Sequence, residues 1–171
     1  MPFLIFLLVF DLTYLYDAHH YNFFLGPIND VLRGKSLLVD INCQYGVGVI
    51  YFLALVFELL PIPLNYQGFA LVLNTLLFLQ YALLYLLMRR VLYSQLFAIA
   101  ALLLILAANY NGSMNMATLP STGPLRFGMT YALLAFFALR PRFAPRPWVQ
   151  MVIYGVVGLS SLWSLESFAY T

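Results

Sequence analysis

Two long uncharged apolar blocks constrain this chain more than any other feature of its sequence. Residues 67–88 form a block of 22 residues and residues 91–108 a block of 18, and neither contains a charged side chain. A helix rises about 1.5 Å per residue, so such blocks reach across most or all of a hydrocarbon core about 30 Å thick. Both blocks are therefore predicted to be helices that face lipid.

The composition agrees with lipid as the solvent. Only 8% of the 171 residues are charged and 64% are hydrophobic, whereas about a quarter of a soluble domain is charged. This excludes a soluble enzyme, a nucleic-acid-binding protein and a disordered tail, and the net charge of +2 gives no sign of a polyanionic partner. We expect an all-α fold, with a single polytopic transmembrane domain over residues 1–171.

Five blocks are predicted to span the membrane: residues 1–16, 67–88, 91–108, 126–139 and 148–165. The first block lacks a basic start and a following cleavage site, so we expect a retained span and not a signal peptide. A further block, residues 49–60, has twelve residues, includes Glu58 and precedes Pro61. That length is typical of interfacial, re-entrant or buried helices.

Two signals disagree on the topology. If residues 49–60 crossed the membrane there would be six spans, with seven of the eight basic residues on one side, and the positive-inside rule would place that side in the cytoplasm. Segment length and Glu58 favour five spans instead. We predict five, with a cytoplasmic N-terminus, an external loop over residues 17–66, and residues 49–60 against the outer face.

Within the loop, residues 26–34 predict a short helix at the membrane surface. Pro27 suits the first position of a helix and Gly34 suits the position just past its end. Ile28, Val31 and Leu32 would share its apolar face. Cys43 is the sole cysteine, which excludes an intrachain disulfide and a cysteine-based metal site.

The densest group of ionisable residues is Asp17-Ala-His19-His20, at the exit of the first span. A carboxylate beside imidazoles can act as a general base or bind a divalent cation. The alternative is that these polar residues mark the water-facing end of a span and anchor it at the interface. No metal ligands are assigned.

The loop resembles the first external loop of GT-C class membrane glycosyltransferases, which use polyprenyl- or dolichyl-phosphate sugars. The resemblance rests on the run Asp17-Ala-His-His-Tyr, Gly26-Pro27, Val31-Leu-Arg-Gly-Lys35, Asp40 and Gln44-Tyr-Gly46, and on looser matches at residues 86–90, 121–127 and 163–167. Two departures stand out: the family has Asp-Glu where Asp17 precedes Ala18, and its proline-rich motif is replaced by residues 44–48. Family members also have about twice as many spans, so the chain resembles their N-terminal half.

The resemblance implies a mechanism and a set of site residues. Asp17 would deprotonate an acceptor hydroxyl, assisted by His19 and His20, while the anomeric carbon of the lipid-phosphate sugar is attacked with inversion. Cationic or metal help is needed for the leaving phosphate. The substrate-binding residues would be Arg33, Lys35, Asp40, Tyr45 and Arg126.

A non-catalytic accessory or scaffold subunit of a larger membrane complex is the rival hypothesis, and a small transporter component is a weaker one. For either leading hypothesis we expect membrane lipids and other membrane protein chains as partners. The donor, if the module is active, would be a polyprenyl-phosphate sugar, with a divalent cation as a possible cofactor. The expected location is the bacterial cytoplasmic membrane.

Overall fold

The computed structural model describes residues 2–10, 17–43, 45–110, 119–139 and 147–163. Within these ranges the fold is all-α, with seven α-helices, one 3-10 turn and no β-strand. The elements are α1 (Pro2–Val9), α2 (Ala18–Leu32), α3 (Val47–Leu59), α4 (Tyr66–Leu92), α5 (Gln95–Tyr110), η1 (Pro120–Thr122), α6 (Pro124–Leu139) and α7 (Pro147–Trp163). The predicted fold class is thus confirmed as helical.

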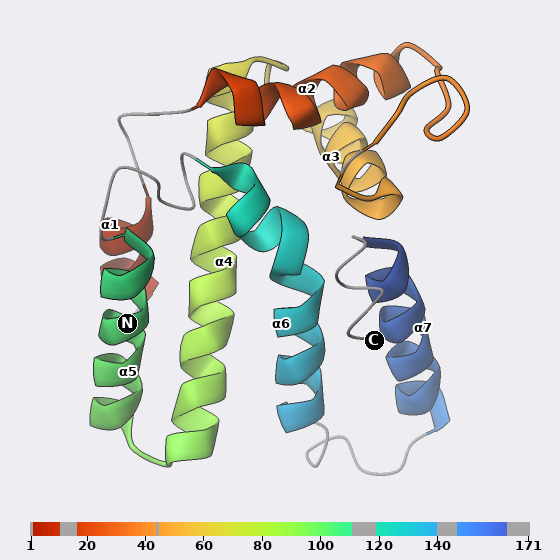
Figure 1. The fold of residues 1–171 in the computed structure, drawn as a ribbon. Coiled ribbons are helices and arrows are strands. Elements are labelled where there is room, and N and C mark those ends of the chain that lie inside the picture. The colour runs from red at the N-terminus through yellow and green to blue at the C-terminus, as the bar shows by residue number, and fades with distance from the viewer. Residues whose placement is uncertain (1, 11–16, 44, 111–118, 140–146, 164–171) are drawn as a thin grey trace.

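The long helix α4 is the centre of the arrangement. It packs against α1, α2, α5 and α6, while α7 packs against α6 and α3. Figure 1 shows α4, α5, α6 and α7 standing side by side, with α2 lying across one end of this bundle and α3 just beneath α2. The loop helices are therefore gathered at one end of the upright helices.

Among the described residues, only α4 is both long and apolar enough to cross a membrane. It has 27 residues, which corresponds to about 40 Å of helix. The apolar helices α3 and α5 are shorter, with 13 and 16 residues. The structure thus supports one candidate span directly, and the five-span topology is taken up below as a proposal.

Helix α2 differs from the predicted short helix over residues 26–34. It begins eight residues earlier than Gly26, at Ala18, and Pro27 lies inside it, so the predicted start is wrong. A proline within a helix costs about 3 kcal/mol. Tyr21, Phe24 and Ile28, all fully buried, lie on one face of α2, and their burial offsets that cost. The predicted end is confirmed, since Gly34 follows the helix with φ +84°.

The long helix does not end at residue 88, where the predicted span ends. Helix α4 continues through Arg89 and Arg90 to Leu92, because cations are favourable in the last turn of a helix. The chain leaves the helix at Tyr93, which adopts a left-handed φ of 51°. Residues 91 and 92, predicted to open the next span, therefore belong to α4.

A cluster of aromatic rings joins α2 to α4 and to the loop before α3. The ring centroids of Tyr21 and Phe69 are 4.9 Å apart in an edge-to-face arrangement, and Phe24 lies 5.8 Å from Phe69. Tyr45 also stacks on Phe24, with ring centroids 4.9 Å apart. Such ring pairs add about 0.5–1.5 kcal/mol beyond burial alone, so this cluster fixes α2 across the end of the bundle.

Helix α3 is held close to α7 by a glycine. A Cβ atom added to Gly48 would lie 2.6 Å from the backbone oxygen of Leu162 and 3.0 Å from the Cα atom of Trp163. No larger residue fits there without moving one of the two helices. Gly48 thus allows the start of α3 to meet the end of α7.

Candidate functional site

Asp17 is the N-cap of α2. Its Oδ1 atom accepts hydrogen bonds from the backbone N–H groups of His19 at 2.9 Å and His20 at 3.2 Å. An aspartate in this position satisfies N–H groups that have no partner within the helix. The first candidate catalytic residue therefore also has a structural task, which the sequence analysis did not assign to it.

The same contacts change the acidity of Asp17. The hydrogen bond from the backbone of His20 is the main cause that lowers the pKa of this carboxyl below its ordinary value of 3.8, against a smaller opposing effect of desolvation. Asp17 is thus ionised at neutral pH, as a proton acceptor must be. A lower pKa also makes a carboxylate a weaker base than one tuned close to neutral pH.

The lowered pKa gives a prediction for stability. Protonation weakens the cap, so the contribution of the charged Asp17 to folding is complete above pH 3.8 and is lost as the pH falls through the lower folded-state pKa. The stabilising effect of Asp17 over Asp17→Asn, measured as a difference in Tm in detergent, is therefore expected to shrink as the pH falls through the acid range. A difference that acid leaves unchanged would contradict this assignment.

His20 is the histidine that lies against the carboxylate. Its Nδ1 atom is 3.3 Å from Asp17 Oδ1, one helical turn along α2. His19 is exposed, and its ring meets that of Phe23 edge to face at 4.8 Å. The structure thus brings Asp17 and His20 together, and it places His19 beside them on the surface.

Arg33, Lys35 and Asp40 lie beyond the opposite end of the same helix. Helix α2 has 15 residues and is therefore about 22 Å long, so these three side chains do not share a site with Asp17. Lys35 forms an ion pair of 2.8 Å with Asp30, and Asp40 accepts a hydrogen bond of 2.9 Å from the backbone of Ser36. The predicted grouping of these residues with Asp17 needs correction, because one continuous helix separates them.

The two remaining predicted residues, Tyr45 and Arg126, lie on other segments. Tyr45 stacks on Phe24 within the aromatic cluster. Arg126 lies in the first turn of α6, with its guanidinium carbon 5.4 Å from the ring centroid of Phe127. The turn η1 just before α6 contacts α2, and Figure 1 places the start of α6 below the N-terminal half of α2. Among the three predicted cations, Arg126 thus lies on a helix that directly follows a turn in contact with α2.

Within the described parts of the chain, no group of three or more His, Cys, Asp or Glu side chains gathers to hold a metal ion. Asp17 and His20 together would supply two ligands, an oxygen and a nitrogen. Two protein ligands leave most of the coordination sphere of a divalent cation to water or substrate.

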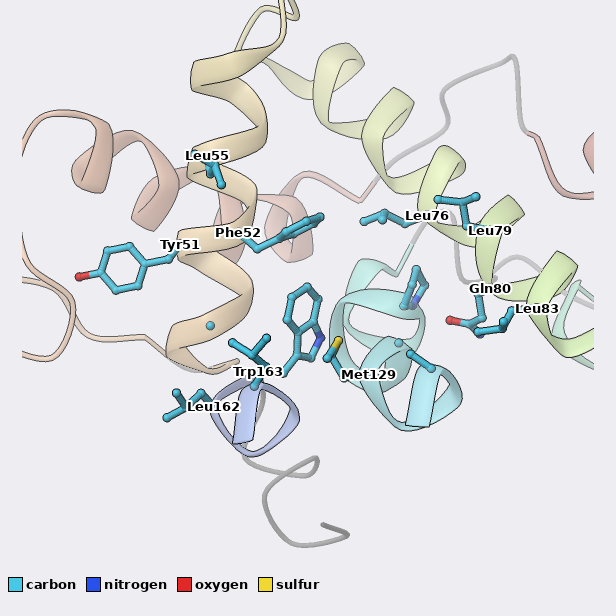
Figure 2. A pocket seen from close by; sticks show the side chains of 15 residues that line it. Tyr51, Phe52, Leu55, Leu76, Leu79, Gln80, Leu83, Met129, Leu162 and Trp163 are labelled. Carbon is cyan, nitrogen blue, oxygen red and sulfur yellow. The ribbon is translucent and has the colours of Figure 1, made fainter. Parts of the chain in front are cut away.

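A second feature was missed by the sequence analysis. A cavity of about 670 Å³ lies between α3, α4, α6 and α7, and Figure 2 shows the side chains that line it. Its lining is almost entirely apolar, and the two exceptions that matter are Gln80 on α4 and Trp163 on α7. The polar Gln80 within an uncharged span was the one sequence signal that pointed to this place.

Comparison of the chain with known protein families, with curated proteins and with solved structures finds no match.

Proposed function

We propose that this chain is an integral membrane glycosyltransferase module of the GT-C type, with Asp17 as the catalytic base. The observation that carries the proposal is the pairing of the Asp17 carboxylate with His20 at 3.3 Å, at the start of a helix that lies across one end of the bundle. An ionised carboxylate at that end is available to an acceptor that arrives from water.

We further propose that the five predicted blocks, which contain α1, α4, α5, α6 and α7, cross the bilayer, and that α2 and α3 lie at its outer face. The upright, side-by-side arrangement of α4 to α7 supports this topology, as does the position of α2 across their ends. The apolar length of α4 supports membrane insertion itself. The bacterial cytoplasmic membrane is the proposed location.

Cys43 tests the topology. It lies in the segment between α2 and α3 and is partly exposed, with its thiol 3.2 Å from the carbonyl oxygen of Gly46. We expect an impermeant thiol reagent to label this sole cysteine in intact cells, with Cys43→Ser as the unlabelled control. Labelling that requires permeabilised cells would support six spans and a cytoplasmic loop.

In the proposed reaction the acceptor hydroxyl oxygen bonds to the anomeric carbon of the donor sugar. The bond between that carbon and the phosphate oxygen breaks, the lipid phosphate leaves with the electron pair, and the hydroxyl proton passes to Asp17. His20 would hold the carboxylate in place through the 3.3 Å contact between its Nδ1 atom and Asp17 Oδ1. Arg126 is the cation we assign to the leaving phosphate, because Arg33 and Lys35 lie past the far end of α2.

Sugar transfer from a polyprenyl-phosphate donor, measured in membranes that carry the chain, tests this function. Transfer above the level of membranes without the chain is expected, and it should depend on Asp17. The absence of transfer with every donor tried would contradict the proposal and favour the second candidate.

The second candidate is a scaffold subunit without catalytic activity. Asp17 is already engaged as a helix cap, so its presence has a structural explanation. Large apolar side chains also cover the outer faces of α5 and α7: Leu96 is 74% exposed and Met151 is 75% exposed. Lipid tails are as apolar as these side chains, so either lipid or the helices of another chain can cover such faces. Co-purification with another membrane chain in a fixed ratio is the result that this role requires.

A further inference from the structure

We propose that the cavity between α3, α4, α6 and α7 binds an uncharged lipid through a hydroxyl group. This inference does not depend on the proposed transferase activity. Its volume of about 670 Å³ lies within the range of 300–1,000 Å³ typical of small-molecule sites. Tyr51, Leu55 and Leu79, which line it, are 45%, 51% and 54% exposed, so the cavity opens at the surface of the bundle.

The apolar lining selects the hydrocarbon part of the ligand. Leu and aromatic side chains from α3, α4 and α7 form most of the wall, among them Phe52 and Leu76. Phe52 packs against the indole of Trp163 with ring centroids 5.2 Å apart. No residue that lines the cavity is charged, and a phosphate or ammonium group would therefore be buried there without a counter-charge, at a cost of several kcal/mol.

Two buried polar atoms determine which polar group the ligand carries. Gln80 is only 6% exposed, and its Oε1 atom has no hydrogen-bond partner in the described chain. The Nε1 atom of Trp163 is also buried and has no partner among the described residues. Figure 2 shows these two side chains reaching toward the cavity from opposite walls. A buried polar atom without a hydrogen-bond partner destabilises the folded chain, so a ligand that supplies a partner to these atoms is favoured.

A hydroxyl group suits either of these atoms. Gln80 Oε1 can only accept a hydrogen bond and Trp163 Nε1 can only donate one, whereas a hydroxyl does both. A carbonyl would satisfy the indole alone, and a plain hydrocarbon would satisfy neither. The chemistry of the cavity thus points to a long-chain alcohol.

The absence of a side chain at Gly128 leaves room in the cavity. Gly128 lies inside α6, where glycine costs about 1 kcal/mol relative to alanine, and it faces the cavity. A Cβ atom added there would meet only the Cβ atom of Pro124, at the ordinary contact distance of 3.5 Å. A side chain at this position would therefore extend into the cavity without a backbone clash.

The test uses the fluorescence of Trp163 in the full chain. The chain has two tryptophans, and Trp148→Phe removes the other one, which is 51% exposed. Hexadecanol brominated along its chain is titrated into the protein in mild detergent, beside brominated hexadecane. We expect saturable quenching of Trp163 by the alcohol and no saturable quenching by the alkane. Equal quenching by the two probes would overturn the proposal, as would tighter binding of the phosphorylated alcohol.

Two variants locate the binding. Gln80→Met keeps the unbranched shape but removes the acceptor, and it should weaken binding by about three- to tenfold while leaving the Tm equal or higher. Gly128→Leu should abolish saturable quenching by filling the cavity. Gly155→Leu is the matched control, because a Cβ atom there meets nothing within 4 Å and the residue does not line the cavity. Unchanged affinity in both Gln80→Met and Gly128→Leu would refute the site.

Discussion

Asp17→Asn is expected to lower sugar transfer by about 10²–10⁴-fold, the usual effect of losing a positioned general base. The variant is informative because asparagine caps helices as well as aspartate does. The hydrogen bonds that Asp17 accepts from His19 and His20 can therefore persist while the base is removed. The measurement is transfer from a polyprenyl-phosphate donor at equal protein levels.

Three further variants distinguish the loss of the general base from the loss of the helix cap. Asp17→Ser should be as inactive as Asp17→Asn, since serine also caps but is no base. Asp17→Ala should lose the cap as well, at about 0.5–2 kcal/mol. Asp30→Asn is the matched control, because Asp30 pairs with Lys35 on the exposed surface and lies outside the proposed site. Full activity of Asp17→Asn would remove this residue from the chemistry.

Phe69→Ala is expected to have the largest effect on stability, about 3–5 kcal/mol. Phe69 is fully buried, and its ring contacts both Tyr21 and Phe24 of α2. Its loss would leave a void where α2 rests on α4, so α2 should detach before the bundle unfolds. The measurements are the Tm in detergent and protease cleavage within residues 17–43.

Phe97→Ala on α5 provides the comparison, since that ring is 65% exposed. Its replacement should change stability by no more than about 0.5 kcal/mol. Equal losses from the two substitutions would show that α2 is not held by the aromatic cluster.

The helical class followed from the sequence because it depends on local properties. Uncharged apolar blocks of 18 to 22 residues predict helices wherever they occur, and α4, α5 and α7 each overlap such a block, while α6 overlaps a shorter block of 14 residues. The end of α2 was also predictable, since Gly34 carries the left-handed φ that favours glycine. Which of these helices cross a membrane stays a prediction, and α4 is the one described helix with the length and apolarity to do so.

The start of α2 and the make-up of the site depended on tertiary contacts. Pro27 predicted a helix start, but the burial of Tyr21 and Phe24 against Phe69 stabilises a longer helix. That continuous helix separates Asp17 from Arg33 and Lys35, a distance that spacing in the sequence did not reveal.

The cavity depended on tertiary structure most of all. Gln80 and Trp163 are 83 positions apart in the sequence, and they face one cavity only because α3, α4, α6 and α7 pack around it. The hydropathy of each segment was enough to predict that these helices are stable in an apolar environment, since hydropathy is a property of the segment alone. Helix packing decided which polar side chains line the same cavity, because the shape of the cavity depends on close approaches such as that of Gly48 to α7.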